Sequence, residues 1–128
     1  MTTLARTWGF RCSLSDVAVL IIAGFLTCWF REDLGLWIWI IPLIVGHFFL
    51  FCNVFRISRE RELWWAAICL ANISGWMFCE EPRWLMILVI QIPVTIAVII
   101  WDMQKSYYHG IFANHINPHL VDYIEERI

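Results

Sequence analysis

The hydrophobic residues of this chain fall into four long blocks that are separated by short charged segments. The clearest block covers residues 36–55, which carry no formal charge and include only His47 and Asn53 as strongly polar side chains. A helix rises ~1.5 Å per residue, and about 20 residues are needed to cross a hydrocarbon core ~30 Å thick. Residues 36–55 therefore predict a transmembrane helix.

Three further apolar blocks cover residues 14–30, 63–79 and 84–101. The segments between the blocks are short and carry Arg, Glu, Asp, Gly or Pro, which favours antiparallel neighbours. We expect a single integral-membrane domain over residues 1–128. The predicted fold class is all-α: a four-helix transmembrane bundle followed by a short amphipathic cytoplasmic tail, residues 102–128.

Composition supports the membrane interpretation. The chain of 128 residues is 61% hydrophobic and 16% charged, whereas a typical soluble domain is about a quarter charged. With the N-terminus in the cytoplasm, seven Lys and Arg residues lie inside and two, Arg31 and Arg83, lie outside. Because short cytoplasmic loops are rich in Lys and Arg, this bias predicts that both termini are cytoplasmic. The expected location is a plasma membrane of the bacterial inner-membrane type.

Three polar side chains lie at depth in different predicted helices: His47, Asn72 and Gln91. Asn72 and Gln91 are both roughly 10 Å from the outer ends of their helices, and His47 is roughly one turn deeper. Ionisable side chains within a membrane are candidates for function. The three residues predict either a polar path or, more simply, hydrogen bonds between helices.

Small residues recur every four positions in two of the predicted helices. This pattern allows helix backbones to approach closely, either inside the bundle or between subunits. The residues predicted to mediate such packing are Gly24, Cys28, Ala67, Ala71 and Gly75. Cys28 and Cys79 both fall near outer helix ends, so a disulfide between them is a further hypothesis.

The cytoplasmic segments carry two more candidate sites. His109, His115 and His119 form a possible metal site in the tail, although Asn117-Pro118 interrupts the helical spacing of the last two. Arg56, Arg59 and Arg61 follow the second block. They are interpreted first as a topology signal at the lipid headgroups and alternatively as a docking site for an acidic surface.

No motif for catalysis or for binding nucleotides or nucleic acid is present, and the sequence identifies no cofactor. The expected partners are the lipid bilayer and either protein subunits or further copies of this chain. The function that fits best is a non-enzymatic accessory or assembly subunit of a membrane complex. The alternatives are a small homo-oligomeric transporter or channel with a path near His47, and a membrane redox protein that uses a metal or cofactor.

Overall fold

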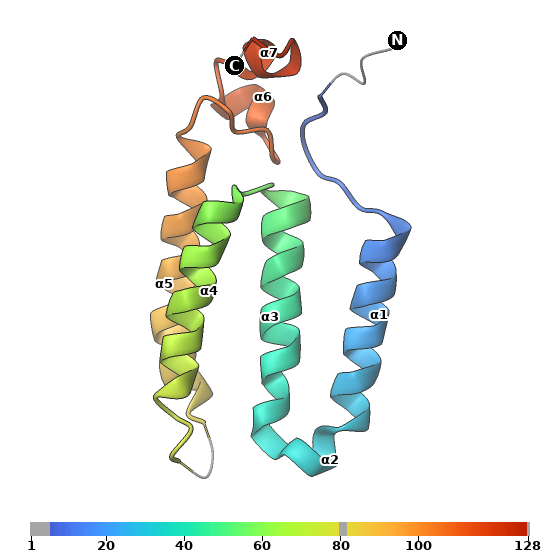
Figure 1. The fold of residues 1–128 in the computed structure, drawn as a ribbon, viewed down its shortest axis with the longest axis vertical. Coiled ribbons are helices and arrows are strands. Elements are labelled where there is room, and N and C mark those ends of the chain that lie inside the picture. The colour runs from blue at the N-terminus through green and yellow to red at the C-terminus, as the bar shows by residue number, and fades with distance from the viewer. Residues whose placement is uncertain (1–5, 80–81, 128) are drawn as a thin grey trace.

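The computed structural model describes residues 6–79 and 82–127, and every regular element within them is helical. Four long helical segments run side by side, and the first and last parts of the chain lie at the same end (Figure 1). We call this the terminal end, and the opposite end, near α2, the far end. The prediction of an all-α protein is confirmed.

Helix α1, Leu14–Trp29, begins directly after its capping residue, Ser13. The Ser13 hydroxyl accepts a hydrogen bond from the Asp16 backbone N–H, and the Asp16 carboxylate accepts one from the Ser13 backbone N–H at 2.8 Å. This reciprocal capping box satisfies two amide groups that the first helical turn leaves without partners.

The second long segment changes its helical type along its length. It comprises α2, Arg31–Leu34; a 3₁₀ helix, η1, Gly35–Trp39; α3, Ile40–Phe49; and a π-helix, η2, Leu50–Val54. Gly35 has a φ of 56°, which glycine adopts without steric cost. Pro42 lies in the first turn of α3, where its missing N–H costs little. The sequence predicted neither the 3₁₀ turn nor the π-helix.

The third and fourth long helices are α4, Arg59–Ser74, and α5, Trp84–Met103. Helix α5 matches the fourth predicted block closely. Helix α4 instead begins within the charged loop and ends before the predicted boundary at residue 79. Gly75 caps it, and turns carry the chain through residues 76–79.

The long segments pack as two antiparallel pairs, α1 with α3 and α4 with α5 (Figure 1). A core cluster on η2, α4 and α5 joins the pairs, and its buried members are Phe51, Ile57, Trp65, Cys69 and Val98. The tail contains two short helices, α6, Ala113–Ile116, and α7, Leu120–Ile124, around a smaller core of Tyr108, Ala113 and Leu120. The predicted amphipathic tail thus contains helices of only four and five residues.

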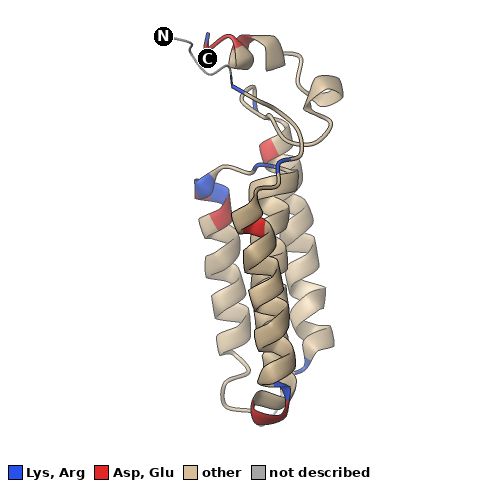
Figure 2. Cartoon of the chain, turned by 90° about the vertical axis from the view of Figure 1, so that its right-hand side faces the viewer, with Lys and Arg blue, Asp and Glu red and all other residues tan. Residues whose placement is uncertain are grey.

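Charged residues lie at the two ends of the long helices, and their middles are almost free of charge (Figure 2). Two helical segments of the described chain are long and apolar enough to cross a membrane: Arg31–Val54 and Trp84–Met103. Within the most apolar window of each, only 11% and 22% of the residues are buried. These two candidate spans therefore point to a membrane location.

Candidate functional site

The buried face of α5 is unusually polar. Its buried residues are Ile87, Gln91, Thr95, Val98 and Asp102, which recur at the three- and four-residue spacing of one helix face. Three of the five are polar. Helix α5 therefore brings hydrogen-bonding groups into the interior at two levels, around Gln91 and Thr95 and again at Asp102.

At the first level, a chain of contacts connects α3, α4 and α5. The Trp65 indole N–H donates to the Thr95 hydroxyl at 2.9 Å, and that hydroxyl donates to the backbone carbonyl of Gln91 at 2.9 Å. The His47 ring stacks on Trp65 with ring centroids 4.5 Å apart, and Phe51 meets both rings edge-on. The position of the His47 ring is thus fixed by aromatic neighbours.

The hydrogen bonding of His47 determines which ring nitrogen is available to a ligand. Its Nδ1 lies 2.8 Å from the Leu43 carbonyl. Since a carbonyl oxygen only accepts, Nδ1 must carry the proton, and in the neutral ring Nε2 is an acceptor. Among the described residues, Nε2 has no hydrogen-bond partner and is not one of the fully buried unpaired atoms.

His47 borders an apolar groove of about 570 Å³ between α3 and α5, which we call the α3–α5 groove. The Trp84 indole N–H donates to the Leu36 carbonyl at 2.8 Å and ties the start of α5 to η1. Apart from His47, the side chains lining the groove are Trp39, Pro42, Leu43, Leu50, Trp84 and Leu88. Its lining is apolar apart from the His47 imidazole and the Trp39 and Trp84 indoles, so the groove suits an apolar molecule.

Gln91 is completely buried, and neither its amide oxygen nor its amide nitrogen has a hydrogen-bond partner in the described part of the chain. An unpaired buried polar group costs about 1–3 kcal/mol. Asn72 is satisfied differently, because its amide donates to the Ile87 carbonyl at 3.0 Å. No hydrogen bond between described residues connects His47, Asn72 and Gln91 to one another.

The small residues that were predicted to mediate packing are on the outside of the chain. Gly24, Cys28, Ala67, Ala71 and Gly75 are all exposed, and a Cβ atom added to Gly24 would meet nothing within 4 Å. Contacts within the chain use Ala23 and Cys69 instead, which are buried. The small residues are therefore available only to a surrounding lipid or another protein.

The hypothesis of a disulfide is not supported. Cys28 and Cys79 are both free thiols, and α1 packs against α3, not beside the end of α4.

At the second level, Asp102 pairs with Arg61. Their side chains are 1% and 8% exposed, and Arg61 Nε lies 3.3 Å from Asp102 Oδ1. The Nε–H group does not point along this line, so the contact is an ion pair without an aligned hydrogen bond. The Ser58 hydroxyl donates to the same oxygen at 2.9 Å, and the Arg61 guanidinium lies over the Trp101 ring.

Asp102 was not among the predicted site residues, because it falls just outside the fourth predicted helix, in the tail. The signal that could have found it is its position: Asp102 lies at the terminal end of α5, and the three arginines of the neighbouring loop lie at the same end.

The three arginines do not form one surface. Arg61 is buried against Asp102, Arg59 is exposed, and Arg56 donates to the Thr7 carbonyl at 2.8 Å. Arg56 also has a left-handed φ of 49°. Burial lowers the pKa of Arg56. Arg61 is therefore buried apart from Arg56 and Arg59.

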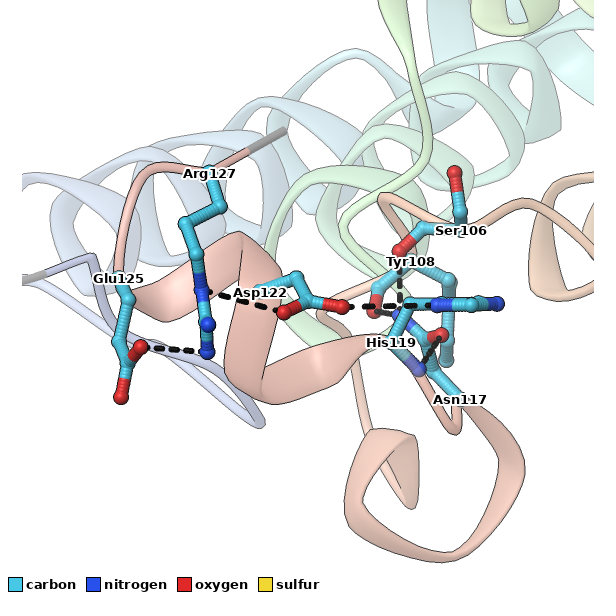
Figure 3. Close-up of polar contacts among 7 residues, drawn as sticks. All are labelled: Ser106, Tyr108, Asn117, His119, Asp122, Glu125 and Arg127. Carbon is cyan, nitrogen blue, oxygen red and sulfur yellow. Dashed lines mark hydrogen bonds and ion pairs between the residues drawn. The ribbon is translucent and has the colours of Figure 1, made fainter.

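Asn117 holds the tail in its folded form, and Gly110 packs the tail against the terminal end. The Asn117 amide donates to the carbonyls of Ser106 and Tyr108, and its oxygen accepts from the His119 backbone N–H (Figure 3). A Cβ atom on Gly110 would lie 2.1 Å from the Phe55 carbonyl oxygen, so only glycine fits there. The tail is thus a packed part of the fold.

The tail histidines do not converge. His109 stacks on Tyr123, His115 is exposed, and His119 lies 3.6 Å from an Asp122 carboxylate oxygen (Figure 3). Burial lowers the pKa of His109. No group of three or more His, Cys, Asp or Glu side chains arranged to hold a metal ion occurs among residues 6–79 and 82–127.

Comparisons with family models, curated proteins and solved structures found no match to this chain.

Proposed function

We propose that this chain is a four-span integral membrane protein with both termini in the cytoplasm, and that it acts as a non-enzymatic accessory or assembly subunit of a membrane complex. The observation that carries the proposal is the apolar surface on all four long segments. Side chains such as Ile21, Leu70 and Leu85 are 66%, 69% and 72% exposed. Soluble proteins rarely expose so much contiguous apolar surface to water.

The two shorter helices, α1 and α4, become long enough to cross a membrane once the residues that follow them are included. A helix of 16 residues is about 24 Å long, which is less than the ~30 Å of a typical core. Phe30 extends α1, and the turn after α4 contributes Met77 and Phe78, which are exposed and apolar. Reporter fusions test this topology: a fusion after Ile128 is expected in the cytoplasm, and one near Pro82 outside.

The exposed small residues support the role of a subunit. Ala67, Ala71 and Gly75 follow one another on the outer surface of α4, away from the contacts that hold this chain together. Such a surface admits a neighbouring helix at close range.

Purification in mild detergent tests the role. We expect a stable complex with other subunits that Ala71→Leu and Gly75→Leu weaken at least fivefold, because a larger side chain prevents close approach. Leu70→Phe, on a different face of α4, is the matched control. Unchanged assembly in both variants would refute the proposal, and so would a complex of this chain alone.

The α3–α5 groove supports a second function, a small homo-oligomeric transporter or channel that handles an apolar molecule. The supporting observation is the unpaired His47 Nε2 beside a groove of about 570 Å³, with the unpaired amide of Gln91 buried nearby. For this function, His47→Leu should abolish activity while His47→Gln, which keeps an acceptor, retains part of it. A normal host phenotype in His47→Leu would exclude it.

A further inference from the structure

A second, polar pocket lies where α4 begins at the terminal end. It has a volume of about 310 Å³, and its lining includes three arginines and one histidine, Arg11, Arg56, Arg59 and His109. They come from the segment before α1, the loop before α4, α4 itself and the tail. We call this the arginine pocket. Arginines from the segment before α1 and from residues 56–59 at the start of α4 thus meet at one cavity, and the tail adds the His109 ring.

The positive charge of the arginine pocket is not neutralised within the described chain. The guanidinium groups of Arg11 and Arg59 have no hydrogen bond or ion pair there, and Arg56 donates only to the neutral Thr7 residue. Glu62 is the one acid in the lining and accepts a hydrogen bond from a cysteine thiol. Three cations therefore face one anion.

Asp16 is a further acid near Arg11. Its Oδ2 atom is held by the Ser13 and Asn53 side chains, at 2.7 and 2.8 Å, and it interacts with Arg11 electrostatically without a direct ion pair. Ser58 directs its side chain to Asp102 and leaves the α4 N-terminus without a side-chain cap, while Glu60 and Glu62 lie in the first turn of this helix.

We propose that the arginine pocket binds the phosphate group of an anionic glycerophospholipid in the cytoplasmic leaflet. This inference rests on the proposed membrane placement, which brings the terminal end to the depth of the headgroups. Arginine recognises phosphate through paired N–H donors, and basic pockets beside membrane helices on the cytoplasmic side favour anionic headgroups. Cys52, on the candidate span Arg31–Val54, also lines the pocket and connects it to the bilayer region.

The test measures binding of phosphatidylglycerol and phosphatidylcholine to the full chain by native mass spectrometry in detergent. The double variant Arg11→Gln/Arg59→Gln removes the two unpaired guanidinium groups. The control, Lys105→Gln/Arg127→Gln, removes the same charge at the terminal end from residues that do not line the pocket. We expect wild type and control to prefer phosphatidylglycerol, and the pocket variant to bind it about 25-fold more weakly, or about fivefold for each arginine.

Three results would overturn the proposal. Equal affinity of wild type for the two lipids would do so, and so would equal losses in the pocket variant and the control. The third is displacement of phosphatidylglycerol by millimolar inorganic phosphate, which would assign the pocket to a soluble anion. Insertion of the wild type into phosphatidylcholine vesicles is measured separately, because failure to insert would refute the membrane placement, whereas insertion without lipid preference refutes this site alone.

Discussion

The Arg61–Asp102 ion pair gives the sharpest prediction about stability. At 3.3 Å and an effective dielectric constant of about 20, the attraction is about 5 kcal/mol, and removal of each ion from water costs several kcal/mol. The intact pair therefore contributes little net stability. Asp102→Asn removes the attraction but leaves the Arg61 charge buried. We expect it to lower the free energy of unfolding by about 3–5 kcal/mol.

The matched variant replaces both partners. Arg61→Leu/Asp102→Leu removes both charges and should be much closer to wild type than Asp102→Asn, because no uncompensated ion remains. The assay is unfolding in detergent, followed by tryptophan fluorescence, for wild type and both variants. A loss below about 1 kcal/mol in Asp102→Asn would contradict the reasoning, as would a double variant that is less stable than the single one.

Three further predictions concern the tail and the buried amide. Gly110→Ala should detach the tail, since the added Cβ atom would lie 2.1 Å from the Phe55 carbonyl oxygen; limited proteolysis should cut the tail at least tenfold faster, and an unchanged cleavage rate would refute the contact. Burial, and to a lesser degree the Asp102 charge, raise the pKa of Tyr108 to about 12 from about 10. The protonated phenol is therefore favoured in the folded state. Its contribution to the free energy of unfolding is complete below pH 10, and up to about 2.7 kcal/mol of stability is lost as the pH rises to 12. An absorbance titration compared with Tyr108→Phe measures the pKa, and ionisation of Tyr108 near pH 10 would contradict the prediction. Gln91→Leu should leave stability unchanged or raise it by about 1–3 kcal/mol, because the two amide atoms lose no hydrogen bond; a lower melting temperature would show that the amide has a partner.

Local signals in the sequence were sufficient for the helices. The Ser13–Asp16 capping box fixes the start of α1, because it depends on residues within one turn. The apolar blocks and the charges between them predicted the all-α fold and the two candidate spans. The four-span bundle itself stays a prediction.

The features that escaped prediction all depend on distant parts of the chain meeting. The Asn53 side chain, on the π-helix, donates from Nδ2 to the Oδ2 atom of Asp16 on α1 at 2.8 Å, and this partner is not apparent from the local sequence pattern. The same holds for Asp102, whose importance depends on Arg61 from another helix. The polar residues at depth were identified, but the partners of His47 and Asn72 are backbone carbonyls or aromatic rings, which periodicity cannot reveal, and the Gln91 amide has no partner in the described chain.

The order in which a ribosome delivers the chain has a consequence for the terminal end. The Gly9 backbone N–H donates to the His109 carbonyl at 2.8 Å, and the Ile111 N–H donates to the Val54 carbonyl at 2.8 Å. These two hydrogen bonds of the first helical pair can therefore form only after residues 109 and 111 have been synthesised. A nascent chain that stops earlier leaves the Gly9 N–H and the Val54 carbonyl without these partners, and exposes this part of the chain to quality-control proteases.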